Sequence, residues 1–168
     1  GYSTAEISSC TNNGNITSSS EFFSFKGGIV GYSTAEIISC TNSGIITSSS
    51  SSSSPFSSYG GGIVGNSSAE IGNCTNSGDV TSSSFYDDHS SNSCGGGIAG
   101  YSSANISNCK NNGTVNATAT HSKSYSYGGG IAGLFSSYAK EIIISNVYNT
   151  GSVTAGSYEG GIVGGFNY

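Results

Sequence analysis

The apolar residues of this chain lie in short β-branched clusters that are separated by small or turn-forming residues. In residues 27–50 the clusters are Ile29-Val30, Ile37-Ile38 and Ile45-Ile46-Thr47. Apolar residues do not keep a helical spacing over three turns in this unit, and β-branched residues bounded by Gly, Asn and Ser are typical of strands. The pattern predicts three short strands in the unit.

The same unit returns along the whole chain. Its most regular part, Gly-Gly-Ile-Val/Ala-Gly, occurs five times, at residues 27–31, 61–65, 96–100, 129–133 and 160–164. Counting from Gly1, the closing glycines are separated by 30, 34, 35, 33 and 31 residues, which indicates one supersecondary unit stacked on copies of itself. We interpret residues 1–168 as one continuous repeat array with units at 1–26, 27–60, 61–95, 96–128 and 129–159, and the start of a further unit at 160–168.

Alternation within the unit indicates how the copies are arranged. In a strand that begins at Cys40, the residues Cys40, Asn42, Gly44 and Ile46 would all point to one face. One coil cannot bury such a strip alone, but coils stacked about 4.8 Å apart would turn each position into a ladder. The predicted fold is all-β: a single-domain right-handed parallel β-solenoid, or β-helix, of about five coils of 30–35 residues.

The repeat predicts three side-chain ladders. Isoleucine and cysteine ladders are expected to be buried, and an asparagine ladder is expected to hydrogen-bond from one rung to the next. At this corner the Asn would tolerate left-handed backbone, and the Gly two residues later would take a positive φ. The members are Ile29, Ile63, Ile98, Ile131 and Ile162; Cys10, Cys40, Cys74, Cys109 and Val147; and Asn12, Asn42, Asn76, Asn111 and Asn149.

Segments of unequal length, rich in Ser, Tyr and Phe, separate the third cluster of one unit from the next Gly-Gly motif. They cover residues 18–26, 48–60, 82–95, 116–128 and 155–159. Insertions in repeat arrays collect on one face, which is often the binding face, so these segments are expected to form variable loops there. Their aromatic side chains are expected to pack on the outside of the solenoid, on one another or on a neighbouring chain.

Composition excludes two classes of function. Only 8% of residues are charged and the formal net charge is -5, so the Lys/Arg clusters that neutralise nucleic-acid phosphates are missing. The apolar runs are far shorter than the roughly 20 residues of a membrane-spanning helix. Candidate N-glycosylation sites, which would require an extracellular protein, stand at Asn15, Asn66, Asn73, Asn105, Asn112 and Asn116.

The residues capable of chemistry favour structural roles. The cysteine ladder is either a column of buried thiols or a set of rung-to-rung disulfides, and Cys94 stands outside it. Glu6, Glu36 and Glu70 would stack as a solvated outer ladder or, alternatively, hold Ca²⁺ or Mg²⁺. No zinc spacing or nucleophile elbow accompanies the Asp87-Asp88-His89 cluster and His121. We therefore expect no enzyme activity, no cofactor and no metal site.

The segment of residues 27–48, GGIVGYSTAEIISCTNSGIITS, resembles the GLUG repeat. Units of that repeat consist roughly of Gly-Gly-Leu-Val-Gly, a short spacer, Ile-X-Asn-Cys/Ser, a turn with Gly, and Val-Thr-Gly. Here Ile replaces the Leu of the family, and the resemblance covers the whole chain. Such repeats belong to large secreted or surface proteins, including adhesins and bacterial proteases that cleave immunoglobulin A, where they lie outside the catalytic domain. The resemblance implies an extracellular or cell-surface stalk or fibre and carries over no catalytic residue.

Two classes of function follow. The first is a structural subunit or segment of an extracellular filament or surface fibre, whose partners are copies of the chain or flanking repeats joined end to end. We expect such joining because the terminal coils have open strand edges without a Pro or Lys that would block them. The second is an adhesin stalk or a solenoid that binds glycans or a cell surface through aromatic loops. Ice binding through Thr17, Thr47 and Thr81 is weaker, because Asn116 interrupts that ladder before Thr154 resumes it.

Overall fold

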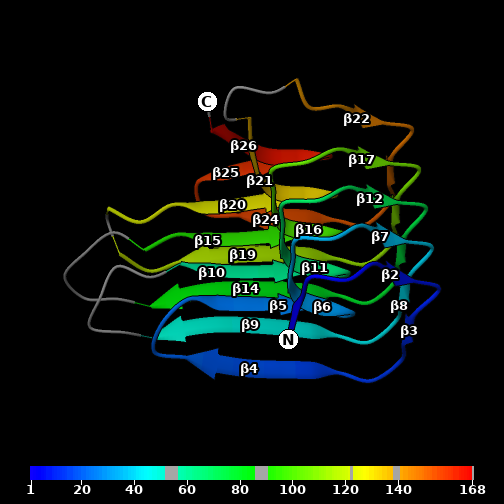
Figure 1. Cartoon of the computed structure of the whole chain (residues 1–168). Helices are drawn as coiled ribbons and strands as arrows, with labels where there is room; N and C mark the ends of the chain where they lie inside the picture. Colours follow the sequence, from blue (N-terminus) through cyan, green and yellow to red (C-terminus); the bar gives the residue numbers. More distant parts are fainter. Residues whose placement is uncertain (52–56, 86–90, 122, 138–140, 168) are drawn as a thin grey trace.

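The chain is a parallel β-solenoid. The computed structural model describes residues 1–51, 57–85, 91–121, 123–137 and 141–167. Every strand pairing among these residues is parallel and joins equivalent positions of successive repeats, as between Val30, Val64 and Ala99. Figure 1 shows the coils stacked from the N-terminus at the bottom to the C-terminus at the top. The fold predicted from the repeat is confirmed.

The strands form five parallel sheets that run along the stack, here named sheets A to E. Sheet A contains β1 (Tyr2–Ser3), β6 (Val30–Ser33), β11 (Val64–Ser67), β16 (Ala99–Ser102), β21 (Ala132–Ser136) and β26 (Val163–Asn167). Sheet B contains β2 (Ile7–Ser8), β7 (Ile37–Ile38), β12 (Ile71–Gly72), β17 (Ile106–Ser107) and β22 (Ile144–Ser145). Sheet C contains β3 (Thr11–Asn12), β8 (Thr41–Asn42), β13 (Thr75–Asn76), β18 (Lys110–Asn111) and β23 (Tyr148–Asn149).

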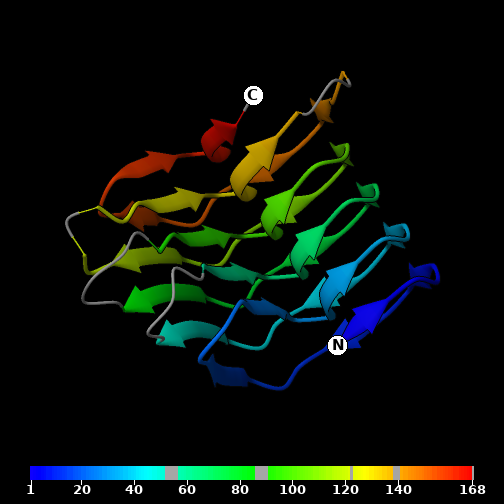
Figure 2. The same ribbon diagram turned by 60° about the vertical axis from the view of Figure 1, so that its left-hand side comes forward.

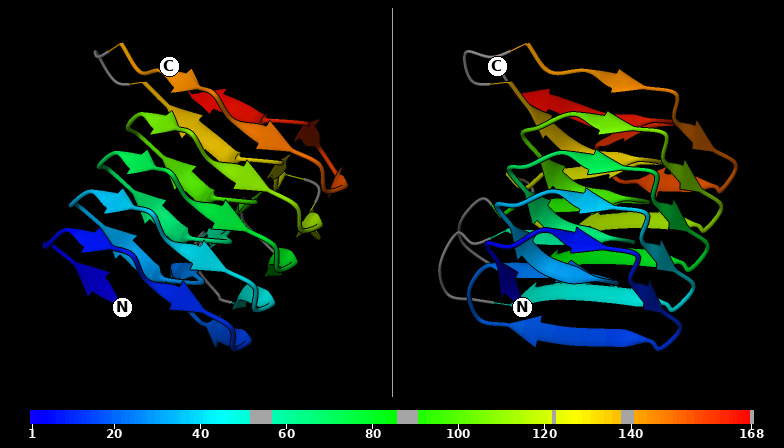
Figure 3. Two further views of the ribbon diagram at one scale, coloured as in Figure 1. Left: turned by 90° about the vertical axis from the view of Figure 1, so that its right-hand side faces the viewer. Right: turned by 45° about the vertical axis from the view of Figure 1, so that its right-hand side comes forward.

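Sheets D and E complete each coil. Sheet D contains β4 (Ile16–Ser20), β9 (Ile46–Ser51), β14 (Val80–Phe85), β19 (Val115–Ala119) and β24 (Val153–Ala155). Sheet E contains β5 (Ser24–Gly27), β10 (Ser58–Gly61), β15 (Ser93–Gly96), β20 (Ser126–Gly129) and β25 (Tyr158–Gly160). The rotated views in Figures 2 and 3 show that each coil follows the path of the coil below it.

The prediction of three strands in each unit was wrong, because a full coil such as β5 to β9 contains five. The first predicted cluster, Ile29-Val30, spans a turn, so that β5 ends at Gly27 and β6 begins at Val30. The segments expected as loops are largely strand: residues 48–51 belong to β9 and residues 58–60 to β10. Described residues that join sheet D to sheet E, such as 21–23 and 120–121, lie on one side of the stack, at the left in Figure 1.

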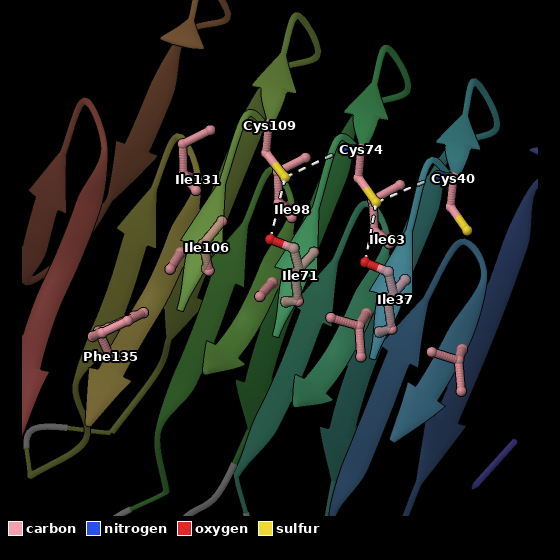
Figure 4. Close-up of a cluster of buried hydrophobic side chains, with 14 residues drawn as sticks. Ile37, Cys40, Ile63, Ile71, Cys74, Ile98, Ile106, Cys109, Ile131 and Phe135 are labelled. Atoms are coloured by element: carbon pink, nitrogen blue, oxygen red, sulfur yellow. Dashed lines mark hydrogen bonds between the residues drawn. The ribbon is translucent and has the colours of Figure 1, made fainter. Parts of the chain in front are cut away.

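The apolar core lies beneath sheets A, B and C. It consists of stacked rows of small and β-branched side chains, which Figure 4 shows in part. Its fully buried members include Ile37, Ile63, Cys74 and Ile98, each 0% exposed. A second and smaller cluster under sheet D contains only Ile46, Val80 and Val115, with Ile16 and Val153 at its two ends.

Serine fills the space between sheets D and E. Ser24, Ser48, Ser58 and Ser82 are completely buried, and their hydroxyl groups form a continuous hydrogen-bonded chain. The oxygen–oxygen distances along this chain are 2.8 Å from Ser24 to Ser48, 2.9 Å from Ser48 to Ser58 and 3.2 Å from Ser82 to Ser58. Buried hydroxyl groups are tolerated when they are paired in this way. Small side chains let the two sheets approach closely, which is why the Ser-rich segments form strands without apolar alternation.

Candidate functional site

The asparagine ladder is a continuous column of side-chain amides. The Nδ2 of Asn42 donates to the Oδ1 of Asn76 at 2.8 Å, and Asn76 donates to Asn111 at 2.8 Å. The same bond joins Asn12 to Asn42 and Asn111 to Asn149. Each Nδ2 also donates to the carbonyl oxygen of the Gly two residues later, for example from Asn42 to Gly44 at 2.8 Å. The three inner amides are completely buried, so the ladder connects every rung by paired polar groups in a dry interior.

Glycine has a different role at this corner from the one predicted. No described Gly has a positive φ, so the expected left-handed Gly is wrong. A Cβ on Gly44 or Gly78 would instead overlap the carbonyl oxygen of the equivalent Gly in the rung below. A Cβ on Gly28 or Gly62 would overlap the side-chain amide of the asparagine ladder. Glycine is required at these positions by close contact between rungs and with the ladder.

The left-handed residue of the coil lies just before the cysteine ladder. Ser9, Ser39, Asn73, Asn108 and Asn146 have φ between 50° and 57° and form the turn from sheet B to sheet C. The corner Asn of the ladder is not among the residues with positive φ, so that expectation is also wrong. Sequence reasoning missed this turn, although the recurrence of Ser or Asn before each Cys was a usable signal, since Asn tolerates left-handed backbone.

The isoleucine ladder lines the apolar core. Ile63, Ile98 and Ile131 are 0% exposed, whereas Ile29 and Ile162, nearest the two ends, are half-buried. The backbone follows the same register, because the N–H of Ile63 donates to the carbonyl of Ile98 and that of Ile98 to Ile131. Each rung therefore covers the isoleucine of its neighbour.

The cysteine ladder is a column of thiols, and all five cysteines of the chain are free. The Cys74 sulfur donates to the carbonyl of Gly72 at 3.2 Å, across the left-handed turn, and accepts the N–H of Cys40 at 3.4 Å. Cys109 repeats this arrangement with Ser107 and Cys74, as Figure 4 shows in part. Val147 continues the column as a half-buried apolar side chain. The thiols thus fill the core and satisfy the carbonyl groups of the turn.

Thiol reactivity should separate Cys10 from the other four cysteines. Cys10 is exposed, whereas Cys40, Cys74, Cys94 and Cys109 are 0% exposed. Burial raises the pKa of Cys40 to about 11 and also raises the pKa of Cys94. The hydrogen bond with Cys109, together with burial, raises the pKa of Cys74. The same hydrogen bond lowers the pKa of Cys109, so it is the complete burial of Cys109 that keeps a reagent away from this thiol. Because the thiolate is the nucleophile, we expect the native protein at pH 8 to alkylate rapidly at Cys10 alone and at all five cysteines in denaturant.

Trypsin makes this measurement direct, since Cys10 lies in peptide 1–26 and the other four cysteines lie in peptide 27–110. Mass spectrometry after a short exposure to iodoacetamide should find label in the first peptide only. Rapid labelling of peptide 27–110, or a disulfide within it, would show that the thiol column is not closed to solvent.

An aromatic row lies along the outside of sheet E. The paired positions Phe25, Tyr59, Cys94, Tyr127 and Tyr158 occupy successive rungs. Phe25 stacks on Tyr59 with ring centroids 5.3 Å apart, and Tyr127 stacks on Tyr158 at 5.1 Å, with interplanar angles of 16° and 10°. Cys94 occupies the middle of this row, completely buried between the two stacked pairs.

The neighbouring row on sheet A completes the aromatic surface. Tyr2 and Tyr32 stack at 5.2 Å, and Tyr32 meets Phe25 edge-on at 5.8 Å. Tyr101 meets Tyr59 edge-on at 5.9 Å. The aromatic side chains therefore pack outside the solenoid and on one another, two of the three alternatives that the sequence left open. Each of the stacked rings Tyr59, Tyr127 and Tyr158 has one face against a neighbouring ring, whereas Tyr2 and Tyr158 stay 66% and 46% exposed.

The remaining predicted sites are dispersed. Among the candidate glycosylation residues, Asn15, Asn73 and Asn112 are exposed and Asn66, Asn105 and Asn116 are half-buried. Thr17, Thr47, Thr81, Asn116 and Thr154 do lie in register on sheet D. Asp87, Asp88 and His89 lie outside the described residues, and His121 is half-buried.

In the predicted glutamate ladder of Glu6, Glu36 and Glu70, the carboxylate of Glu70 pairs with a side-chain amide. Asn105 donates to the Oε1 of Glu70 at 2.8 Å, and an open cavity of about 260 Å³ is lined by Glu36, Glu70, Asn105 and Glu141 among others. In the described ranges, no three His, Cys, Asp or Glu side chains are grouped so that they could hold a metal ion. Nor does the described part of the chain contain a helix long and apolar enough to cross a membrane.

Comparison with known proteins identifies one similarity. The model of the GLUG motif matches residues 91–116, which confirms the resemblance seen in the sequence. The matched segment runs from just before β15 into β19 and so covers most of one coil. Neither the curated proteins nor the solved structures gave a match. The comparison and the fold together define a repeat-based β-solenoid module.

Proposed function

We propose that this chain is a rod-forming structural segment of an extracellular filament or surface fibre, and that it has no catalytic role. The observation that carries the proposal is the continuity of its ladders: all five sheets, the asparagine column and the core rows pass through successive rungs in one register. In a stack of this kind each rung bonds to the rungs above and below it, so every added rung lengthens the rod and continues its hydrogen-bonded ladders. The partners would be copies of the chain or flanking repeats that extend the stack.

The outer strands of the stack support extension. In sheet D, for example, β4 and β24 are the outermost strands, and each pairs with one neighbour. Unpaired N–H and C=O groups on such edges are templates for another strand. The low charge of the chain, with 8% charged residues, supplies little repulsion against this contact.

The aromatic rows favour a structural role over glycan recognition. A sugar ring binds to the open face of an aromatic ring, whereas Tyr59 and Tyr127 each have one face against a neighbouring ring, Phe25 or Tyr158, and the buried Cys94 on the next rung on the other side. Stacked rings of this kind contribute to rung cohesion, roughly 0.5–1.5 kcal/mol for each pair beyond area burial. We therefore assign these rings to the rod itself.

Association of the 168-residue chain tests the proposal. The N–H of Ile16 donates to Ile45 in the next rung, so by strand alternation the N–H of Thr17 points to the free edge of β4. We expect the particle size of the unaltered chain, measured by light scattering, to increase with protein concentration. T17P should reduce this increase, because it removes an edge donor without losing a hydrogen bond inside the stack. T17A, which keeps the donor, serves as control.

A stable monomer with both end coils protected from hydrogen exchange would contradict open-edge association. Electron microscopy of native material then distinguishes the two forms of the proposal, because continuous filaments indicate a polymer and isolated rods on cells indicate a stalk.

A further inference from the structure

Two pairs of tyrosines lie on adjacent rungs at paired strand positions. Tyr127 of β20 pairs with Tyr158 of β25, and Tyr2 of β1 pairs with Tyr32 of β6. Their ring centroids are 5.1 Å and 5.2 Å apart, with interplanar angles of 10° and 11°. Because both side chains of a pair leave parallel strands in the same direction, equivalent ring carbons lie about one rung apart.

This arrangement favours radical coupling of phenols. Loss of one electron and one proton from a tyrosine leaves a radical whose spin density lies partly on the ring carbons next to the hydroxyl group. Two such carbons can form a bond, after which the hydrogen on each moves to its oxygen and the rings become aromatic again. The balance is two tyrosines and one hydrogen peroxide giving one dityrosine and two waters.

We propose that Tyr127–Tyr158 and Tyr2–Tyr32 are sites of oxidative coupling to dityrosine by a haem peroxidase that uses hydrogen peroxide. The inference does not depend on the function proposed above, because it concerns the chemistry of ring pairs within one chain. Coupling would join rungs covalently and so lock the stack.

Position and exposure favour these pairs over the other tyrosines. The ladder holds the two phenols of each pair together, which gives coupling the high effective concentration of an intramolecular reaction. Tyr2 is 66% and Tyr158 46% exposed, so an oxidant reaches one ring of each pair. Tyr59 and Tyr101 approach edge-on at 80°, a geometry that does not align the carbons next to their hydroxyl groups.

A third tyrosine lies beside the Tyr127–Tyr158 pair. Tyr125 is 47% exposed, and its ring centroid lies 6.3 Å from that of Tyr127 and 5.7 Å from that of Tyr158. An oxidant can therefore also remove an electron from this cluster through Tyr125.

The four lysines make the products distinguishable. Trypsin separates Tyr127, in peptide 124–140, from Tyr158, in peptide 141–168, and separates Tyr2, in peptide 1–26, from Tyr32, in peptide 27–110. After treatment of the 168-residue chain with a haem peroxidase and peroxide, the monomer is expected to show dityrosine fluorescence. It should also yield both joined peptide pairs, each lighter by two hydrogens than the sum of its parts.

Conservative variants identify the tyrosine of peptide 141–168 that takes part in the bond. Y158F keeps the ring and its stacking but removes the phenol, so it should lose the link between peptides 124–140 and 141–168 and keep the link between 1–26 and 27–110. Y148F is the matched control: Tyr148 is in the same peptide and 60% exposed, but its ring stacks on no other described ring, so both links should remain. Three results would overturn the proposal: no joined peptides in the monomer, an undiminished link in Y158F, or coupling of Tyr127 to Cys94 in place of Tyr158.

Discussion

Replacing Ile63 with Asp should unfold the array near room temperature. Ile63 is 0% exposed in the middle of the isoleucine ladder, with equivalent isoleucines in the rungs on both sides. No cationic side chain is in this core cluster, so the introduced carboxylate would be buried and unpaired. Burial of an unpaired charge costs several kcal/mol, which is comparable to the whole stability of a typical domain of about 5–15 kcal/mol.

Circular dichroism and chemical denaturation measure this effect. The control is I143D, which makes the same change at an isoleucine that is 53% exposed at the edge of the stack. Its free energy of unfolding should change by roughly 0.5 kcal/mol or less, as for most surface substitutions. If I63D has the same melting temperature as the unaltered chain, the isoleucine ladder faces solvent and is not part of a packed core.

The period of the chain was sufficient to predict the stacked fold and the register of its ladders. Equal spacing of Gly-Gly-Ile-Val/Ala-Gly requires that equivalent residues lie on adjacent rungs, and the alternation from Cys40 to Ile46 indicates which of them point inward. Cys40, Asn42, Gly44 and Ile46 are indeed buried, while Thr41, Ser43 and Ile45 are exposed. These inferences depended on the repeat period and on the alternation of side-chain direction along a strand, and both leave a pattern in the sequence.

The number of strands could not be predicted in the same way. A strand such as β10, with the sequence Ser-Tyr-Gly-Gly, shows no apolar alternation, because its inner side chain Ser58 contacts other serines rather than hydrocarbon. Pattern reasoning assumes an apolar core and therefore assigned this segment to a loop. A core of hydrogen-bonded hydroxyl groups is favourable only when sheet D lies opposite, which is information about tertiary structure.

Glycine was identified as important for the wrong reason. Sequence reasoning assigned Gly44 a left-handed conformation, as is usual for Gly in turns. In the structure the left-handed residue is Ser39, and Gly44 is needed because another backbone passes against its Cα. Conformation and close contact select the same residue type, so sequence alone does not separate them.

Replacing Gly62 with Ala should destabilise the array strongly, although it adds only one methyl group. A Cβ at Gly62 would overlap the backbone oxygen of Gly97 in the next rung and the side-chain amide of Asn76. Neither group can move freely, because Asn76 is bonded to Gly78 at 2.7 Å and to Asn111 at 2.8 Å. The variant would combine overpacking with the loss of buried hydrogen bonds, for an expected loss of about 3 kcal/mol.

The matched control for this substitution is G72A. Gly72 lies in β12 of sheet B, the second strand after Gly62, and a Cβ there would meet only the Ser107 hydroxyl, at an ordinary 3.7 Å. Since Ala restricts the unfolded chain more than Gly does, this variant should be neutral or up to about 1 kcal/mol more stable. Thermal melting of the two variants under one set of conditions gives the comparison. If G62A and G72A had the same melting temperature, Gly62 would not be under steric constraint, and the contact between the Gly-Gly turn and the asparagine ladder would not hold the rungs in register.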